Sequence, residues 1–556
     1  MRHALVVGAL LTAGLLTAPR AEACGGFFCS RVPIDQSGER IVFGVRDNTV
    51  EAHVQIQYQG AAEKFSWVVP MPALPTLEVG TPLIFGYLDS RTQPRFQLQW
   101  QNSCQGDGRG GVLDNYDGAP PSPSAPQEDS GGGGVVVISQ SEVGPYDAAI
   151  LQATEGTALR EWLVSNGYDL TDQGSAALEP YVGQGLYFVA LKLQQNRQAG
   201  DLRPIVLRFQ GNKPCIPIKL TAIAARPDMP IIAYVLSNQR AIPLNYRHVL
   251  INPTRINWVR FGDNYTQVAT EAVDEAGGQA FLTEFAGAST AIAQGYDAFL
   301  PDYELAPLSQ RTHPVDFAEE LLRQGFGQDP SIQGMLRKYI PIPASLVEQG
   351  ISEAAFYNSL SSYRSAIDSD PNRPPFNHTG FVQEIQDSIV TPAEKSLEML
   401  QSHPYLTRLF TTMSAEEMTV DPDFDFNNVA PDVSNMFTAK ASFETCDSDR
   451  SKRRVRFELP DGRYWYAAFG DGPLGAGPSA LRVEQWSNVG PAALVKDNSS
   501  LVNKALDDNG GGGEPPTGRR AATAAPRSPP ARRSSRRCPR RPRCHRGPCS
   551  PGCCCP

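Results

Sequence analysis

The chain has 556 residues, of which 41% are hydrophobic and 20% charged, a composition typical of a folded protein with roughly two or three hydrophobic cores. Its net charge of −9 conceals a division, because residues 519–556 carry 11 arginines and no acidic residue, which leaves −20 on the rest of the chain. An acidic body without a basic patch argues against nucleic acid as a partner.

Residues 1–23 have the pattern of a secretory signal peptide. A basic start at Arg2 is followed by an almost unbroken apolar run over residues 4–18, and the segment ends at the small residue Ala23. The apolar run is shorter than the ~20 residues that a membrane-spanning helix needs. We therefore expect cleavage between Ala23 and Cys24 and export to the periplasm, the outer cell surface or the extracellular space.

Cys24, the first residue of the expected mature chain, is compatible with three roles. A lipid anchor is one, although Ala21 stands three places upstream, where a leucine-like residue is expected. An N-terminal nucleophile that uses its own amine as the base is another. Cys29 lies five residues on, beyond two glycines, in a compartment that oxidises thiols. We therefore favour the third role, a disulfide between Cys24 and Cys29.

The other cysteines are divided between the body of the chain and its tail. The body contains five cysteines and the tail contains six more. Besides Cys24 and Cys29, the disulfide candidates are Cys104 and Cys215, which can be tied together across the segment between them. Since five is an odd number, Cys446 is left over or pairs with the tail.

Residues 24–104 show the alternation of half-buried β-strands. In residues 50–59 apolar and polar residues alternate, which places His53 on the polar side, where we expect a surface residue. The same pattern recurs in residues 65–69 and 96–100. One-sided alternation with short connections predicts an antiparallel, sandwich-like N-terminal half.

The composition changes in residues 105–134, where Gly, Pro, Ser and Asp predict a disordered loop. Residues 135–309 are predicted to be a mixed, β-rich part with one amphipathic helix at residues 157–166. The strands expected in this part are residues 135–138, 186–193, 205–209, 216–223 and 231–236.

Residues 310–418 are predicted to be helical. Two apolar stripes at helical spacing support this prediction, namely Phe317, Leu321 and Leu322, and Phe381, Ile385 and Ile389. Thr391 and Glu394 have the spacing of a capping box that opens a further helix.

The C-terminal part completes an α+β fold. Residues 419–500 are expected to form a short β element, with a hairpin that turns at Asp461 and Gly462. Residues 501–556 are predicted to be a disordered glycine-rich spacer followed by a tail of Arg, Pro and Cys.

One pattern has the chemistry of a metal site, because oxygen-bearing side chains alternate at Asp421, Asp423, Asp425 and Asn427. Hard oxygen ligands outside the cytoplasm favour calcium. Phe426 stands where a calcium-binding helix-loop-helix needs glycine, so we favour a solvated acidic turn instead. The sequence has no zinc-ligand spacing, nucleophile elbow or phosphate-binding loop. We therefore assign no catalytic residue and expect no other cofactor.

Several motifs occur in one order along the chain: "CGGFFC" followed by "IDQSGERIVF", then "HVQIQYQGAAEKFSWVVPMP", "LREWLVSNGYDL", "AFLTEFAG" and "YLTRLFTTMSAEEMTVDPDFDFN". Together they resemble the exported bacterial family catalogued as domain of unknown function 2330, from Cys24 to about Asn435. The resemblance implies export. It implies no reaction, ligand or catalytic residue.

We therefore hypothesise an exported, non-enzymatic protein of the cell envelope or surface that binds or scaffolds an unidentified envelope component. The alternatives are an N-terminal-nucleophile hydrolase that uses Cys24 and a calcium-stabilised, adhesin-like protein. The tail from about Arg519 has the composition expected of a frameshifted remnant of an anchoring tag. Membrane attachment is thus expected only through such a tag or through a lipidated Cys24.

Overall fold

The computed structural model describes residues 35–59, 65–102, 104, 135–168, 172–194, 202–329, 331–469 and 473–512. The predicted signal peptide, the Cys24–Cys29 segment with its three candidate roles, the 105–134 loop and the arginine-rich tail lie outside the described residues. The fold class of the described part is α+β, as predicted.

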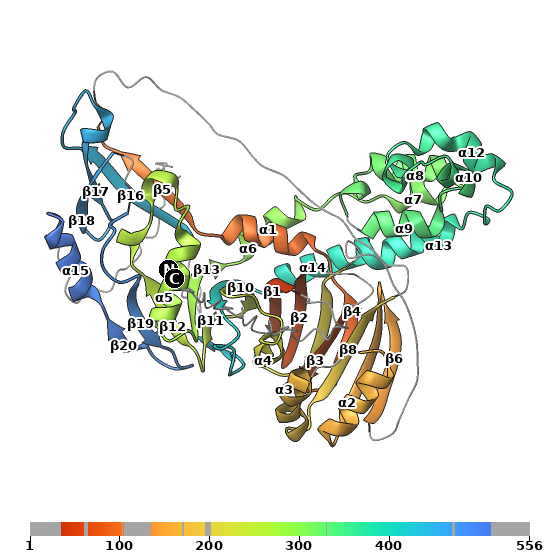
Figure 1. Cartoon of the computed structure of the whole chain (residues 1–556), viewed down its shortest axis with the longest axis horizontal. Coiled ribbons are helices and arrows are strands. Elements are labelled where there is room, and N and C mark those ends of the chain that lie inside the picture. The colour runs from red at the N-terminus through yellow and green to blue at the C-terminus, as the bar shows by residue number, and fades with distance from the viewer. Residues whose placement is uncertain are drawn as a thin grey trace, which may run out of the picture. The chain divides into compact units, whose positions relative to one another are not determined.

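A ten-stranded sheet forms the centre of the described fold, in the order β20-β19-β12-β13-β14-β10-β1-β2-β9-β4 (Figure 1). Neighbouring strands are antiparallel except in the pairs β1–β10 and β12–β13. The strands are β1 (Asp35–Arg46), β2 (Thr49–Gln59), β4 (Thr76–Val79), β9 (Ile205–Gln210), β10 (Met229–Ser237), β12 (Arg247–Ile251), β13 (Ala280–Ala288), β14 (Tyr405–Met413), β19 (Ala480–Gln485) and β20 (Ala493–Asp497).

A four-stranded antiparallel sheet in the order β3-β8-β7-β6 packs against one face of the large sheet. Its strands are β3 (Ser66–Met71), β6 (Val135–Val143), β7 (Tyr146–Ala153) and β8 (Tyr187–Leu193). Val50, Ala52 and Val54 of β2 are buried in the shared core, as their alternation predicted. The sandwich-like N-terminal half is therefore confirmed.

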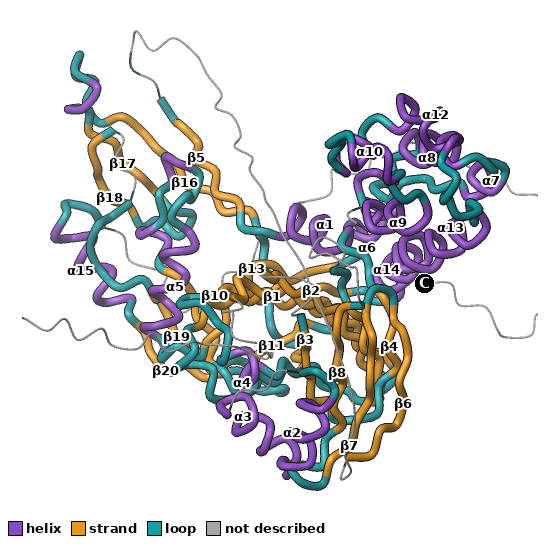
Figure 2. Tube along the Cα trace, turned by 45° about the vertical axis from the view of Figure 1, so that its right-hand side comes forward, coloured by secondary structure: helices purple, strands orange, loops and turns teal. Residues whose placement is uncertain are grey.

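Helices cover the outer face of each of these two sheets. Figure 2 shows α2 (Gly156–Ser165) and α3 (Asp172–Gly183) on the four-stranded sheet, where Leu159 and Leu163 are fully buried. The opposite face of the large sheet is covered by three helices, α1 (Leu83–Thr92), α6 (Thr290–Asp297) and α14 (Thr391–Ser402).

A second four-stranded sheet, β18-β17-β16-β5, has its own core with α15 (Ser499–Asp508). Its strands are β5 (Arg95–Trp100), β16 (Met436–Phe443), β17 (Arg454–Glu458) and β18 (Tyr464–Ala468). The hairpin β17–β18 confirms the predicted turn, where Gly462 has a φ of +87° that favours glycine. Two short strands, β11 (Arg240–Pro243) and β15 (Phe424–Asn427), pair with each other. The helix α5 (Tyr265–Glu275) packs on β12 and β19.

The predicted helical region has a separate hydrophobic core, in which Phe381, Ile385 and Ile389 are fully buried. Leu322 of the other predicted stripe is instead 44% exposed. The helices are α7 (Leu305–Ser309), α8 (Pro314–Arg323), α9 (Ser331–Tyr339), α10 (Ala344–Glu348), α11 (Glu353–Tyr357), α12 (Arg364–Ser369), α13 (His378–Ile385) and a π-helical turn (Gln386–Val390).

Two predicted boundaries and one predicted element type are wrong. The helical region ends at Ser402 instead of residue 418, because β14 is buried on both faces and therefore lacks the alternation of a half-buried strand. Residues 216–223 contain the short helix α4 (Ile218–Thr221), since Pro217 cannot donate to a strand ladder. The spacer predicted from residue 501 begins inside α15.

Two local predictions are also wrong. Thr391 is not a helix N-cap, because the helix continues into α14 from the π-helical turn, and the Thr391 hydroxyl accepts a hydrogen bond from Gln386 instead. His53 is 1% exposed and not a surface residue. It lies on the face of the large sheet that α14 covers, and its ring lies 2.7 Å from the Glu51 carboxylate.

Candidate ligand-binding pocket

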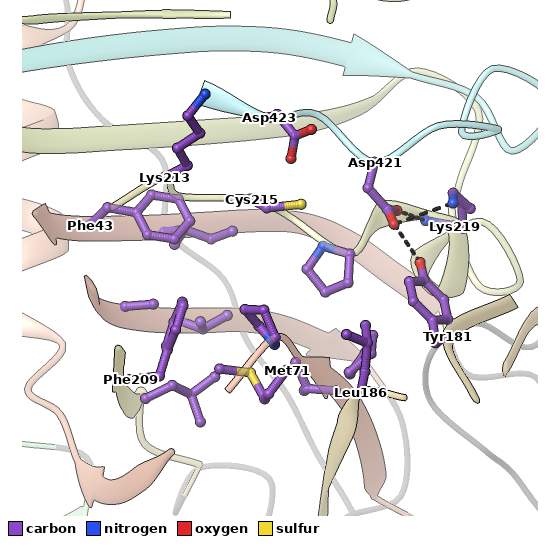
Figure 3. Close-up of a pocket in the computed structure, with 18 of the residues that line it drawn as sticks. Phe43, Met71, Tyr181, Leu186, Phe209, Lys213, Cys215, Lys219, Asp421 and Asp423 are labelled. Carbon is purple, nitrogen blue, oxygen red and sulfur yellow. Dashed lines mark hydrogen bonds and ion pairs between the residues drawn. The ribbon is translucent and has the colours of Figure 1, made fainter. Parts of the chain in front are cut away.

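A cavity of about 430 Å³ lies between the two sheets of the sandwich (Figure 3). Its walls come from β1, β2 and β9 of the large sheet and from β3 of the small one. The walls are mainly apolar and consist of Ile41, Phe43, Ala52, Val54, Trp67, Val69, Met71, Leu186, Leu207 and Phe209. An apolar cavity of this size between two sheets has the dimensions of a small-molecule site.

The two-residue repeat of a β-strand explains which side chains form these walls. Ile41 and Phe43 are two residues apart on β1 and so share a face, as do Leu207 and Phe209 on β9. The small side chain of Ala52 lies between them on β2 and leaves space. β3 lies at the edge of its sheet. Proline has no backbone N–H, and an edge strand tolerates Pro70 because one side of that strand forms no hydrogen bonds to a neighbouring strand.

Polar side chains form the mouth of the pocket, defined here as Lys213, Cys215, Lys219, Asp421 and Asp423. They come from two segments, before and within α4 and before β15, which an antiparallel bridge joins at Cys215 and Asp423. Figure 3 shows Cys215 and Asp423 close together above the apolar side chains. The pocket therefore has an apolar interior and a charged entrance.

Two ion pairs involve most of the charged side chains at the mouth. The Asp421 carboxylate accepts hydrogen bonds from the Tyr181 hydroxyl, at 2.8 Å, and from the Lys219 backbone N–H, at 3.0 Å. It also lies 3.5 Å from the Lys219 ammonium. Lys213 points away from the apolar side chains in Figure 3, and its ammonium lies 2.8 Å from the Asp425 carboxylate.

Glu39 is the buried acidic residue of the lining and is 5% exposed. Desolvation raises the pKa of its carboxyl to about 7, although a hydrogen bond from Thr221 partly opposes this shift. Its Oε2 atom is buried and has no hydrogen-bond partner among the described residues. An acceptor left unpaired in a largely apolar cavity is costly to the protein unless something else binds it.

The expected pairing of Cys104 with Cys215 is wrong. Cys104 forms a disulfide with Cys446, at a Cα–Cα distance of 5.5 Å. The topology explains this pair, because β5 and β16 run parallel side by side, and the two cysteines follow the corresponding ends of these strands.

Cys215 is an exposed free thiol at the pocket mouth. Desolvation by the pocket walls, together with the carboxylates of Asp423 and Asp421, raises its pKa. A thiol held in its protonated form is a poor nucleophile. Cys215 therefore lacks the activation that a catalytic cysteine needs.

The structure does not assemble the four candidate calcium ligands as a set. Asp421 and Asp425 face different lysines. The Asn427 side chain donates hydrogen bonds to the carbonyls of Ser487 and Gly490 and accepts two from the backbone N–H groups that follow it. Within the described ranges, no group of three or more His, Cys, Asp or Glu side chains is placed to hold a metal ion.

A second polar cluster places Thr283, His248 and Glu484 in a row. The His248 ring lies 3.0 Å from the Thr283 hydroxyl and 3.3 Å from the Glu484 carboxylate. Arg240 donates to the same hydroxyl at 2.9 Å and stacks on Trp486. His248 is 2% exposed, so a substrate would reach it only if these neighbours moved. We interpret the cluster as a buried network that holds β11 on the large sheet.

Sequence reasoning missed the pocket, although two of its signals were readable. Glu39 lies in phase with Ile41 and Phe43 on β1, so a carboxylate occupies the apolar face of a strand. The prolines of "WVVPMP" were a second signal, because Pro70 and Pro72 both line the cavity. Nothing in the local pattern indicated that residues near 215 and 421 meet at its mouth.

A family model described as an uncharacterized protein conserved in bacteria (DUF2330) matches residues 18–324, which is more than half of the chain. No curated protein and no solved structure matches the chain. Of the helices in the described part, none is long and apolar enough to cross a membrane.

Proposed function

We propose that this chain, which belongs to the uncharacterised bacterial family of domain of unknown function 2330, is an exported binding protein whose sandwich pocket holds a small amphipathic molecule. The observation that carries the proposal is the pocket itself, with apolar walls from four strands and charged side chains only at one end. Each methylene group of a ligand that moves from water into such walls contributes about 0.8 kcal/mol.

The chemistry of the mouth favours binding over catalysis. Asp421 and Lys219 face each other, and so do Asp425 and Lys213, so each of these side chains is held by an oppositely charged partner. The raised pKa of Cys215 makes the thiol a weak nucleophile at neutral pH. A polar end can therefore be held at the mouth of the pocket while the apolar part of the ligand fills the interior.

Two features support export to the cell envelope or surface. Residues 1–23 have the pattern of a cleavable signal, and the Cys104–Cys446 disulfide is of a kind that persists in oxidising compartments. The partner that delivers or receives the ligand is then another envelope component. Cell fractionation and N-terminal sequencing of the mature protein test this part of the proposal, and an uncleaved cytoplasmic chain would contradict it.

The binding proposal is tested with the neutral fluorophore N-phenyl-1-naphthylamine and the mature full-length chain. We expect its fluorescence to rise on binding and the binding to be lost in Ala52→Phe and Leu186→Trp, which fill the pocket from opposite walls. Leu186 lies at a partly exposed position that tolerates a larger side chain. The matched control is Ala354→Phe at an exposed position of α11.

Circular dichroism establishes that each variant is folded before its binding is compared. Binding that persists unchanged in both pocket variants would place the probe elsewhere and overturn the proposed function. A wild-type chain that does not bind the probe would overturn it as well.

A further inference from the structure

The carboxylates around the pocket mouth outnumber the ammonium groups. Asp421 and Asp423 of the mouth, together with the neighbouring Asp425, which is not part of the pocket lining, lie near Lys213 and Lys219. Because each lysine lies against one of the other two aspartates, no ion pair with Asp423 forms among the described residues. One negative charge therefore remains without a cation at the entrance of an apolar cavity.

Asp423 is held in place by its backbone. Its N–H donates to the Asn245 side chain at 2.8 Å, and its carbonyl accepts from the Leu244 N–H at 2.8 Å. Its carboxylate receives a hydrogen bond from the Cys215 thiol, which is a weak donor. The Asp423 carboxylate therefore lies beside the cavity, and most of its lone pairs are available to accept hydrogen bonds from a ligand.

Glu39 provides the second, independent observation. It is 95% buried and lines the cavity from β1, and its Oε2 atom has no partner among the described residues. Above pH 7, where the Glu39 carboxyl is ionised, a ligand oxygen that carries no hydrogen would face this acceptor lone pair to lone pair. A ligand N–H or O–H would instead satisfy it and remove the cost of an unpaired buried acceptor.

On the basis of the proposed function, we infer that the ligand of this pocket is an amphipathic molecule whose polar end donates hydrogen bonds, such as a primary alkyl ammonium group, and not a carboxylate. Asp423 is the charge partner of that group at the mouth. Glu39 accepts a hydrogen bond from a donor inside the cavity. Charge-assisted hydrogen bonds of this kind are about twice as strong as neutral ones.

The experiment compares ligands that differ only at the polar end. Decylamine, decanol and decanoate, each below its micelle concentration, are titrated against the mature chain with bound N-phenyl-1-naphthylamine. We expect decylamine to displace the probe at a concentration about 10-fold lower than decanoate, with decanol between them. Asparagine and glutamine keep an acceptor oxygen but carry no negative charge, so Asp423→Asn and Glu39→Gln should each reduce this preference to about threefold or less.

The matched control is Asp47→Asn, which removes a carboxylate that is 83% exposed and outside the pocket lining. It should leave the order of the three ligands unchanged. Asp423 is partly exposed, so its substitution is compatible with folding and keeps the test decisive if Glu39→Gln proves unstable.

The outcomes separate this inference from the proposed function. A probe that binds the wild type and is displaced equally well by all three ligands, or best by decanoate, overturns the ligand class and leaves the binding function standing. An amine preference that survives in both pocket variants overturns the assignment of Asp423 and Glu39. A probe that does not bind at all overturns the proposed function, and with it the ligand class.

Discussion

Arg203 and Asp329 form a salt bridge of 2.7 Å in which each side chain is only 3% exposed. Arg203 precedes β9 of the sandwich, whereas Asp329 precedes α9 of the helical region. The same guanidinium donates to the Ser331 hydroxyl at 2.7 Å and to the Ser388 carbonyl. A single arginine therefore connects the sandwich to two separate segments of the helical region.

Arg203→Ala should destabilise the protein strongly. The substitution leaves the Asp329 carboxylate buried without its cation, which typically costs 3–5 kcal/mol. Urea denaturation measures the loss. The matched control is Arg160→Ala, which breaks a pair with Asp172 whose side chains are 44% and 90% exposed. That change should cost less than about 1 kcal/mol. Equal losses in the two variants would contradict the anchoring role of Arg203.

The three cysteines of the described part should differ in their reaction with iodoacetamide. Cys215 should be alkylated without reduction once the protein is unfolded in urea, because its thiol is free, whereas its raised pKa should make the reaction slow in the native protein. Cys104 and Cys446 should react only after reduction. Peptide mapping by mass spectrometry distinguishes these sites. A Cys215 that is alkylated only after reduction would show that the thiol is paired.

Removal of the Cys104–Cys446 disulfide should also reduce stability, since it links residues 342 positions apart. A cross-link restricts the unfolded chain, and its loss typically costs about 2–5 kcal/mol. Urea denaturation of the double variant Cys104→Ser with Cys446→Ser measures this loss. Cys215→Ser is the control and should change the free energy of unfolding by less than about 0.5 kcal/mol.

These cysteines show where sequence patterns stop being informative. Alternation predicted β2 correctly because one face of that strand is apolar and the other polar. It missed β14, where Leu406 and Leu409 are both buried on a central strand. The Cys104–Cys446 pair depends on a parallel contact between β5 and β16, and no local pattern reports which distant strands become neighbours.

The pocket was beyond sequence reasoning for the same reason. Its apolar walls have the ordinary pattern of core strands, and a cavity differs from a filled core only in how two sheets pack. Lys213 and Asp421 reach its mouth through a bridge between segments about 200 residues apart. Local signals came only from Glu39, a carboxylate in phase with buried apolar residues, and from Pro70 and Pro72.

Glu39→Gln should stabilise the protein at pH 8 and have little effect at pH 5. Desolvation raises the pKa of the folded-state carboxyl to about 7 from an ordinary value of 4.5. A raised pKa contributes stability below the ordinary value, and that contribution is lost as the pH rises through about 7. The glutamine cannot ionise, so it should gain on the order of 3 kcal/mol over the wild type at pH 8.

Urea denaturation of both proteins at pH 5 and pH 8 measures this difference. Glu142→Gln, at an exposed position of β6, is the control and should change the free energy of unfolding by less than about 0.5 kcal/mol. A gain of the same size at both pH values would mean that packing, and not ionisation, is responsible.

His248 should contribute a loss of stability as the pH drops below 6.5, opposite in sign to the contribution of Glu39. Burial lowers the pKa of this histidine below 6.5, and Arg240 adds to the effect while Glu484 partly opposes it. A histidine with a lowered folded-state pKa binds its proton more readily in the unfolded chain, so acid favours unfolding.

His248→Gln keeps a side chain that can hydrogen-bond to Thr283 but removes the titration. The difference in free energy of unfolding between pH 7.5 and pH 5.5 should therefore be smaller in the variant than in the wild type. An unchanged difference would show that His248 is not ionised on unfolding in this range.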